Sequence, residues 1–156
     1  MRRPSLLPLA LLAALVAPLG LAGCAGKGAA APTPIFTDTV EVGAAKIQVE
    51  FTHETPGKRQ VLIKLKMRNL GMEETEKLVA DVHVTGGFNI EEGSTHWEGF
   101  VPPRQPQTFT VRLVVPEGHE TASATVTLLR SLDSLVLVKE DVEFTVSEGG
   151  AIKPAS

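Results

Sequence analysis

Apolar and polar residues alternate with a period of two along most of the chain between residues 45 and 147. The alternation covers six runs, whose apolar members begin at Ile47, Val61, Leu78, Phe109, Ala122 and Val142. Successive side chains of a β-strand point to opposite faces, so each run is expected to be a strand with one face in a core and the other in water. The pattern therefore predicts an all-β domain.

Turn-forming residues separate the alternating runs. They include Pro56-Gly57, Asn69-Leu70-Gly71, Gly86-Gly87, the proline-rich residues 102–106 and Pro116-Glu117-Gly118. About seven short strands, each bounded by Gly, Pro or Asn, predict a single antiparallel β-sandwich over residues 35–147. Residues 73–79 are too few, and too closely followed by the alternating pattern, to count as a helix.

The first 23 residues have a different pattern. Arg2 and Arg3 precede an apolar stretch over residues 6–21 that is interrupted only by two prolines and a glycine. This stretch is shorter than the roughly 20 residues that a membrane-spanning helix needs. A basic start followed by a short apolar run is typical of a secretory signal peptide, so residues 1–23 are predicted to be one.

The apolar stretch ends in Leu21-Ala22-Gly23-Cys24, which contains the only cysteine of the chain. These four residues resemble the lipobox of bacterial lipoproteins. The resemblance implies that the Cys24 thiol receives a diacylglyceryl group, that the signal peptide is removed before Cys24, and that the new amino terminus is often acylated too. Each buried methylene contributes about 0.8 kcal/mol, so two or three acyl chains hold a protein on a membrane. The alternative is a cleaved, soluble secretory protein.

The mature protein is therefore expected to be extracytoplasmic and anchored to a membrane through Cys24. Ala25 follows the cysteine instead of aspartate, which resembles the sorting pattern for the outer membrane of a Gram-negative bacterium; otherwise the anchor lies in the outer face of the plasma membrane. Because the anchor uses the single cysteine, no disulfide can form within the chain. Residues 24–34 are small and rich in Gly and Pro and predict a flexible linker, and residues 148–156 predict a disordered tail.

The mature chain is mildly acidic. Its 15 basic residues fall to 13 without Arg2 and Arg3, against 18 acidic residues, which gives a net charge of −5. The absence of a basic cluster argues against nucleic-acid binding and against a polybasic contact with lipid headgroups. Six phenylalanines, one tryptophan and no tyrosine provide few of the aromatic rings that sugar-binding sites use.

Several segments resemble bacterial immunoglobulin-like domains of surface proteins. They are Lys-Met-Arg-Asn-Leu-Gly at 66–71, Val-Ala-Asp-Val-His-Val-Thr-Gly-Gly-Phe at 79–88, Gly-Ser-Thr-His-Trp-Glu-Gly at 93–99, Phe-Thr-Val-Arg-Leu-Val-Val-Pro-Glu-Gly at 109–118 and Ala-Thr-Val-Thr at 124–127. The resemblance implies an immunoglobulin-like or fibronectin-type-III-like β-sandwich. It implies architecture more than activity, because such domains serve as spacers, adhesion modules and assembly partners.

No combination of side chains indicates catalysis. The four histidines, at positions 53, 83, 96 and 119, lie on different predicted segments and lack the His-x-His spacing of a metal site on a strand. The serines lack a Gly-x-Ser-x-Gly motif, and the acidic pairs are adjacent residues, which a strand places on opposite faces. We therefore expect no cofactor, no metal and no enzymatic activity. The alternatives are a small metal-handling or enzymatic lipoprotein and a cell-wall or carbohydrate-binding module.

Residues 86–104 depart from the regular alternation and contain Phe88, His96, Trp97 and Phe100. Loops on a rigid sandwich concentrate binding residues, and tryptophan is a favoured anchor at interfaces. These four residues are therefore the predicted contact surface for a protein partner in the cell envelope, with the chain as a binding or structural accessory of an envelope complex. In the alternative interpretation, Trp97 fills the gap between the sheets as a core residue. The sequence does not determine the oligomeric state.

Overall fold

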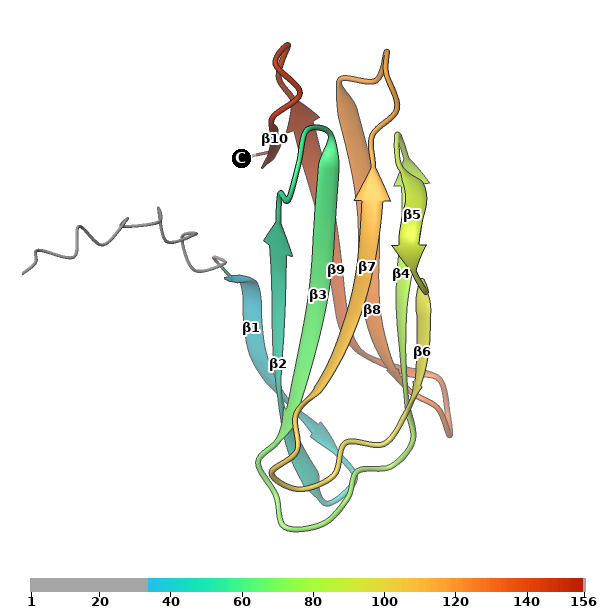
Figure 1. Ribbon diagram of the computed structural model, residues 1–156. Coiled ribbons are helices and arrows are strands. Elements are labelled where there is room, and N and C mark those ends of the chain that lie inside the picture. Colours follow the sequence, from blue (N-terminus) through green and yellow to red (C-terminus); the bar gives the residue numbers. More distant parts are fainter. Residues whose placement is uncertain (1–33, 156) are drawn as a thin grey trace, which may run out of the picture. The chain divides into compact units, whose positions relative to one another are not determined.

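The computed structural model describes residues 34–155, which form ten β-strands and no helix (Figure 1). The predicted signal peptide, Cys24 and all of the predicted linker except Pro34 lie outside the described residues. None of residues 34–155 belongs to a helix that could span a bilayer. The strands are β1 (Pro34–Val42), β2 (Ala45–Glu54), β3 (Gln60–Asn69), β4 (Leu78–Gly86), β5 (Asn89–Gly93), β6 (His96–Gly99), β7 (Gln107–Val114), β8 (Thr121–Arg130), β9 (Leu135–Val146) and β10 (Ile152–Pro154).

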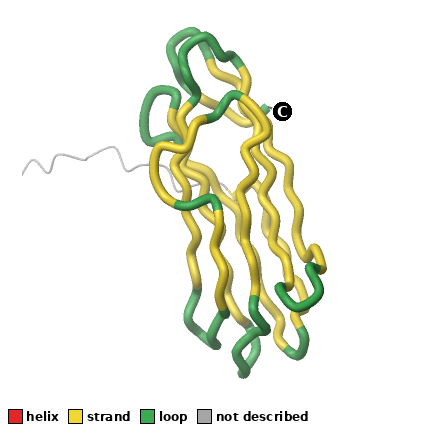
Figure 2. Tube along the Cα trace, turned by 90° about the vertical axis from the view of Figure 1, so that its right-hand side faces the viewer, coloured by secondary structure: helices red, strands yellow, loops and turns green. Residues whose placement is uncertain are grey.

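The strands form two antiparallel sheets that face each other as a β-sandwich (Figures 1 and 2). Sheet A has the strand order β1-β2-β3-β7-β5, and sheet B has the order β10-β9-β8-β4-β6. The prediction of an all-β, antiparallel sandwich is confirmed. The predicted number of about seven strands is wrong, because the described residues form ten.

All six alternating runs lie in strands, namely β2, β3, β4, β7, β8 and β9. The four strands that these runs do not cover, β1, β5, β6 and β10, are the edges of the two sheets. An edge strand pairs with a neighbouring strand on one side only, and its other side is open to water. Its side chains therefore follow the alternation less strictly. On β1, for example, the exposed Asp38 pairs in register with the buried Val49 of β2.

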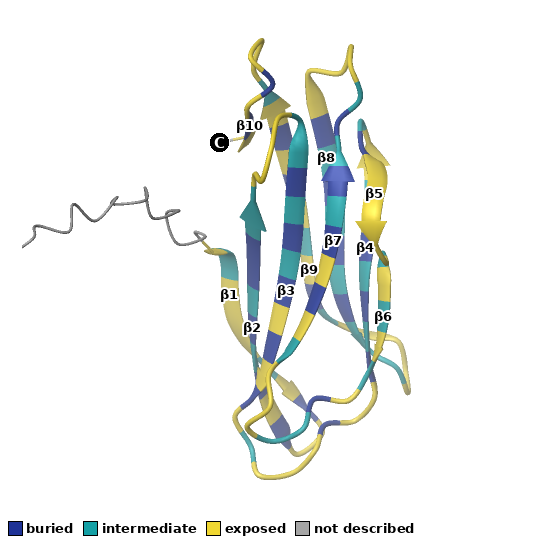
Figure 3. Ribbon diagram, viewed as in Figure 1, coloured by how far each residue is buried: buried dark blue, intermediate teal, exposed yellow. Residues whose placement is uncertain are grey.

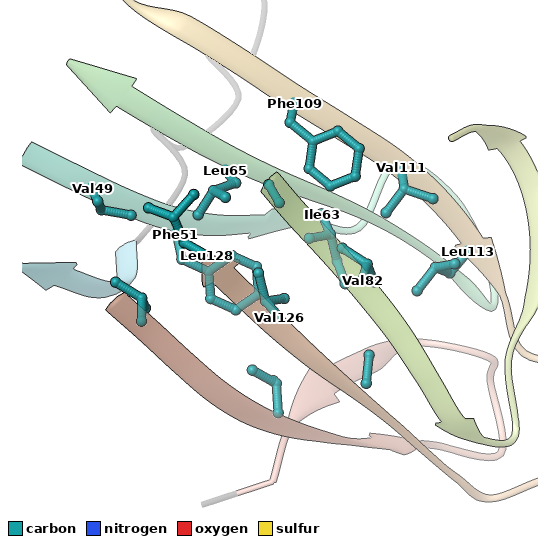
Figure 4. Close-up of a cluster of buried hydrophobic side chains, with 14 of the residues drawn as sticks. Val49, Phe51, Ile63, Leu65, Val82, Phe109, Val111, Leu113, Val126 and Leu128 are labelled. Atoms are coloured by element: carbon teal, nitrogen blue, oxygen red, sulfur yellow. The ribbon is translucent and has the colours of Figure 1, made fainter. Parts of the chain in front are cut away.

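One apolar core fills the space between the sheets. In the central strands β2, β3, β4, β7 and β8, buried residues alternate with exposed or half-buried ones (Figure 3). Figure 4 shows how side chains from both sheets meet in this core, among them Phe51 and Ile63 of sheet A and Val126 and Leu128 of sheet B. The inward face of every predicted run supplies this core, as the period of two requires.

The chain crosses from sheet B to sheet A between β4 and β5. Gly87 lies at this crossing with a φ of +68°, and a Cβ atom there would collide with the carbonyl oxygen of Thr121. Only glycine fits such a position without strain. The predicted turn at Gly86-Gly87 is therefore a close approach of two backbones.

The prediction of a disordered tail over residues 148–156 is wrong for the residues that the structure describes. Strand β10 pairs with the end of β9, with Ile152 opposite Val146 and Lys153 opposite Thr145. Ile152 is only 5% exposed and belongs to the core. The burial of Ile152 and the backbone pairing with β9 together dock the last strand.

Candidate binding surface

Three loops lie at one end of the sandwich, at the bottom of Figure 1. They are residues 70–77 between β3 and β4, residues 100–106 between β6 and β7, and residues 131–134 between β8 and β9. These loops, together with Leu135 and Val136 at the start of β9, are named the apolar end. Pro34, the first residue of β1, lies far from the apolar end, because it pairs with Thr52 near the opposite end of β2.

Exposed large apolar side chains gather at the apolar end. Residues 34–155 have seven such side chains, of which six lie at this end, and the seventh is Ile90 on the edge strand β5. Leu132 and Met72 are the most exposed, at 84% and 78%. The remaining four are Leu70, Phe100, Leu135 and Val136. Because a gathering of exposed apolar side chains marks an interaction site more often than scattered ones do, this end is the candidate binding surface.

Buried polar side chains hold two of the loops in place. The Nδ2 atom of Asn69 donates to the carbonyl oxygens of Glu73 at 2.6 Å and Val101 at 2.9 Å, and its Oδ1 atom accepts from Gly71 N at 2.8 Å. The hydroxyl oxygen of Thr75 accepts from Val101 N at 2.9 Å. Asn69 and Thr75 are 3% and 5% exposed. Satisfied buried hydrogen bonds of this kind rigidify a structure, so the exposed apolar side chains stand on a fixed platform.

The charged side chains beside Leu132 pair with one another. Arg130 Nη2 donates to Asp133 Oδ2 at 2.5 Å, and Arg130 Nε lies 3.7 Å from Glu76 Oε2. The hydrogen bond from Arg130 lowers the pKa of Asp133 to about 2. In the same way, the hydrogen bond from Lys77 lowers the pKa of Glu98. The apolar end therefore presents apolar contacts flanked by paired charges.

The structure separates the four residues predicted as a contact surface. Phe88 is 8% exposed in the core, where its ring meets Phe144 edge to face at 5.5 Å. Trp97 is half-buried and packs against the core from the edge strand β6, where it pairs with Ala80. Only Phe100, at 47% exposed, belongs to the apolar end.

His96 is exposed on the outer face of sheet B. Its Nδ1 atom lies 2.7 Å from Asp81 Oδ1 on the neighbouring strand β4. It thus faces away from Trp97, which follows it on the same strand and faces the core. The segment 86–104 is therefore two short edge strands and a loop, whose side chains serve different parts of the molecule.

The other histidines lie on separate elements: His53 on β2, His83 on β4 and His119 between β7 and β8. Within residues 34–155, no three His, Cys, Asp or Glu side chains form a group that could hold a metal ion. The ring of His53 lies 5.7 Å from that of Phe144, and its buried Nδ1 atom has no hydrogen-bond partner. Burial lowers the pKa of His53, which favours the neutral ring.

The sequence did not point to most of the apolar end. The only indication in the sequence is that apolar residues stand in loops, where polar residues are usual. Examples are Met72 after Gly71 and Leu132 between Ser131 and Asp133. Such single residues are uninformative until the fold brings them to one place. Of the six side chains, the sequence predicts only Phe100, because it lies in the segment 86–104 that departs from the alternation.

No protein-family model and no curated protein matches this chain. Among solved structures, the fold is similar to a FixG-related protein from Vibrio parahaemolyticus, at 14% identity and a TM-score of 0.44, covering 67% of this chain and 97% of that one. It is also similar to the GAE domain of GGA2p from Saccharomyces cerevisiae, at 16% identity and a TM-score of 0.39, covering 72% of this chain and 98% of that one. Both TM-scores are below 0.5, so neither similarity bears on function.

Proposed function

We propose that this chain is a bacterial envelope lipoprotein, anchored through acylated Cys24, that acts as a non-enzymatic binding or structural accessory of an envelope complex. The lipobox-like Leu21-Ala22-Gly23-Cys24 behind an apolar signal supports the anchor. The observation that carries the binding role is the gathering of six exposed apolar side chains at the apolar end. No feature of residues 34–155 specifically favours the metal-handling, enzymatic or carbohydrate-binding alternatives.

The sandwich is proposed to be immunoglobulin-like. Constant-type immunoglobulin domains have strands ABED in one sheet and GFC in the other, lettered along the chain. The orders β2-β3-β7-β5 and β9-β8-β4 agree with these when β2, β3, β4, β5, β7, β8 and β9 are lettered A to G. Strands β1, β6 and β10 then extend the edges of this seven-strand core.

The lengths of the linker and the strands favour a partner beyond the anchoring membrane. The ten residues 24–33 reach at most about 36 Å when fully extended. A ten-residue strand spans about 33 Å, so the apolar end lies roughly that far from the point where the chain enters the fold. Bringing this end to the anchoring bilayer would need an almost fully extended linker, which is entropically unfavourable. The apolar end is therefore expected to face away from that bilayer, towards a protein.

The anchor is tested by Cys24→Ser. The substitution removes the thiol that would carry the lipid, so incorporation of labelled palmitate should be lost and unprocessed precursor should accumulate. Palmitate labelling that survives in Cys24→Ser would contradict the anchor and leave the soluble secretory alternative.

The binding role is tested by photocrosslinking in native membranes. A photoreactive amino acid in place of Phe100 is expected to give an adduct with an envelope protein, and a second substitution, Leu132→Gln, should reduce that adduct. Because Leu132 is 84% exposed, this substitution should change the free energy of unfolding by no more than about 0.5 kcal/mol.

The matched control is Ile90→Gln, which removes an exposed apolar side chain away from the apolar end. It should leave the Phe100 adduct unchanged. An adduct that Leu132→Gln and Ile90→Gln reduce equally, or crosslinks to lipid alone, would count against a protein-binding apolar end.

A further inference from the structure

We propose that the outer face of sheet B is the contact surface of a parallel homodimer. This face consists of the outward side chains of β9, β8 and β4, whose alternate residues are buried in the core. Strand β8 is the central strand of sheet B. Its outward residues are all uncharged, and they are Thr121, Ser123, Thr125, Thr127 and Leu129. The middle of the face therefore holds no charge that a second copy would have to desolvate.

Three rows of side chains cross this face in register, with one residue each from β9, β8 and β4. They are Val136–Leu129–Val79, Lys139–Thr127–Asp81 and Asp141–Thr125–His83. The first row is apolar throughout. The second has opposite charges at its two ends, and the third has a carboxylate at one end and a histidine at the other.

A twofold axis parallel to β8 makes these rows complementary to themselves. It places each row opposite the same row of the second copy, with the ends exchanged. Lys139 then faces Asp81 of the second copy, and Asp141 faces His83. The apolar row packs against its own copy, with Leu129 at the axis. This self-complementarity is what an isologous interface requires.

The opposite, antiparallel arrangement is less favourable. An axis perpendicular to β8 within the interface would place β9 against β9. An axis at the height of Lys139 or of Asp141 would place that side chain against its own copy, and like charges in direct opposition are destabilising. An axis midway between these two rows would pair Lys139 with Asp141, but it would place the apolar row against the polar row of Glu143 and Ser123. The parallel arrangement also keeps both Pro34 residues at one end, as two copies in one membrane require; this second argument rests on the proposed anchor.

Contacts within one copy already position the polar side chains. Thr125 Oγ1 donates to Asp141 Oδ1 at 2.5 Å, and Asp81 Oδ1 lies 2.7 Å from His96 Nδ1. Lys139 Nζ lies 3.9 Å from Asp141 Oδ2, and the lysine side chain is 58% exposed. It is therefore accessible to a carboxylate of a second copy.

The size of the face limits the strength of the dimer. Three strands spaced about 4.8 Å apart and about 30 Å long have a flat area on the order of 400 Å². Stable complexes typically bury about 800 Å² of accessible surface per partner. The dimer is therefore expected mainly where two anchored copies share a membrane, which raises their effective concentration.

Cysteine crosslinking of the full chain in native membranes tests the dimer. Thr127→Cys places a thiol close to the axis, and Thr110→Cys places one on β7, on the outer face of sheet A. On oxidation, Thr127→Cys should give at least about five times more covalent dimer than Thr110→Cys, the ratio that corresponds to roughly 1 kcal/mol of association. Equal yields from the two variants, or from Leu129→Cys and Thr110→Cys, would overturn the proposal.

A charge exchange tests the parallel register. In the Thr127→Cys chain, Lys139→Glu turns two attractive pairs of the dimer into repulsive ones and should lower the yield about three- to ten-fold. Adding Asp81→Lys to the same chain should restore it. Failure of this restoration would overturn the parallel arrangement. A covalent dimer of the unsubstituted chain would show that the Cys24 thiol is free, which would refute the proposed anchor. The dimer would then be tested with the same cysteine substitutions in the Cys24→Ser chain.

Discussion

At each end of the sandwich, one polar side chain holds neighbouring loops together. The two ends nevertheless expose different surfaces. At the apolar end, Asn69 joins the loops 70–77 and 100–106. At the other end, Arg59 donates to the carbonyl oxygens of Val115 at 2.7 Å, Pro116 at 2.5 Å and His119 at 2.6 Å. The apolar end exposes six large apolar side chains. At the Arg59 end, the loops 55–59, 115–120 and 147–151 expose none, and Ile90 on the edge strand β5 is the one large apolar side chain exposed nearby.

This comparison separates the ordering of loops from their surface chemistry. At each end, one polar side chain donates to several loop carbonyl oxygens. In the loop of Leu132, Ser131 N donates to the carbonyl oxygen of Lys77 at 2.9 Å. The exposed Met72 and Leu132 are therefore not a side effect of poorly held loops. Since polar residues serve equally well at the Arg59 end, the apolar residues at the other end have no evident structural role. Their role is better explained by contact with another molecule, as proposed above.

The largest effect is expected for Asn69→Ala. Asn69 is 3% exposed and makes three hydrogen bonds, so its loss leaves buried groups without partners and should reduce the free energy of unfolding by about 2–4 kcal/mol. Urea denaturation measures this. The exposed Asn89 on β5 provides the control, since Asn89→Ala should change stability by no more than about 0.5 kcal/mol. Similar losses in both variants would mean that Asn69 does not hold the apolar end.

A smaller effect is expected for Arg59→Ala. Arg59 is only half-buried, so water can replace many of the hydrogen bonds that its guanidinium donates. The free energy of unfolding should therefore fall by about 1–2 kcal/mol. Arg68→Ala, at an exposed position of β3, is the control for loss of an arginine. The Phe100 adduct should persist in Arg59→Ala and weaken in Asn69→Ala. If Arg59→Ala removes the adduct as well, the two ends are coupled and the comparison fails.

The sequence predicted the central strands well because two faces of different polarity impose a strict alternation. Val61, Ile63, Leu65 and Met67 are all fully buried on β3, as the period of two requires. The alternation fails in the first half of β9, where a bulge opposite Leu128 and Leu129 breaks the register. It fails too at the edge strands, where Asp38 and Ile90 face water from positions that the pattern would assign to the core.

The candidate surface was harder to predict because it depends on contacts between distant residues. Leu70, Phe100 and Leu132 are at least 30 positions apart, and only the closure of the sandwich brings them to one end. The turn signal Asn69-Leu70-Gly71 correctly predicts the end of a strand at Asn69. That Asn69 also holds a second loop through Val101 could not be inferred, since nothing in the local sequence links the two.

The smallest effect is expected from acid, and it should differ between the two ends. His53 lies towards the Arg59 end, and burial lowers its pKa below the usual 6.5. The unfolded chain therefore binds a proton before the folded chain does, so stability is full above about pH 6.5 and declines as the pH falls towards the lower folded pKa. At the apolar end, the pKa of Asp133 falls from 3.8 to about 2. That contribution is full above about pH 4 and is lost only as the pH falls through about 2.

Urea denaturation measured from about pH 8 to about pH 2 spans both pKa values and separates the two effects. His53→Phe should remove the decline that begins near pH 6.5, because phenylalanine keeps the ring against Phe144 without a titrating nitrogen. Arg130→Gln should leave that decline intact and weaken the one below pH 4, because Asp133 loses the donor that lowers its pKa. If His53→Phe and the unsubstituted chain lose stability in parallel from pH 6.5 downwards, His53 titrates freely in the folded protein, and the Arg59 end is no more sensitive to mild acid than the apolar end.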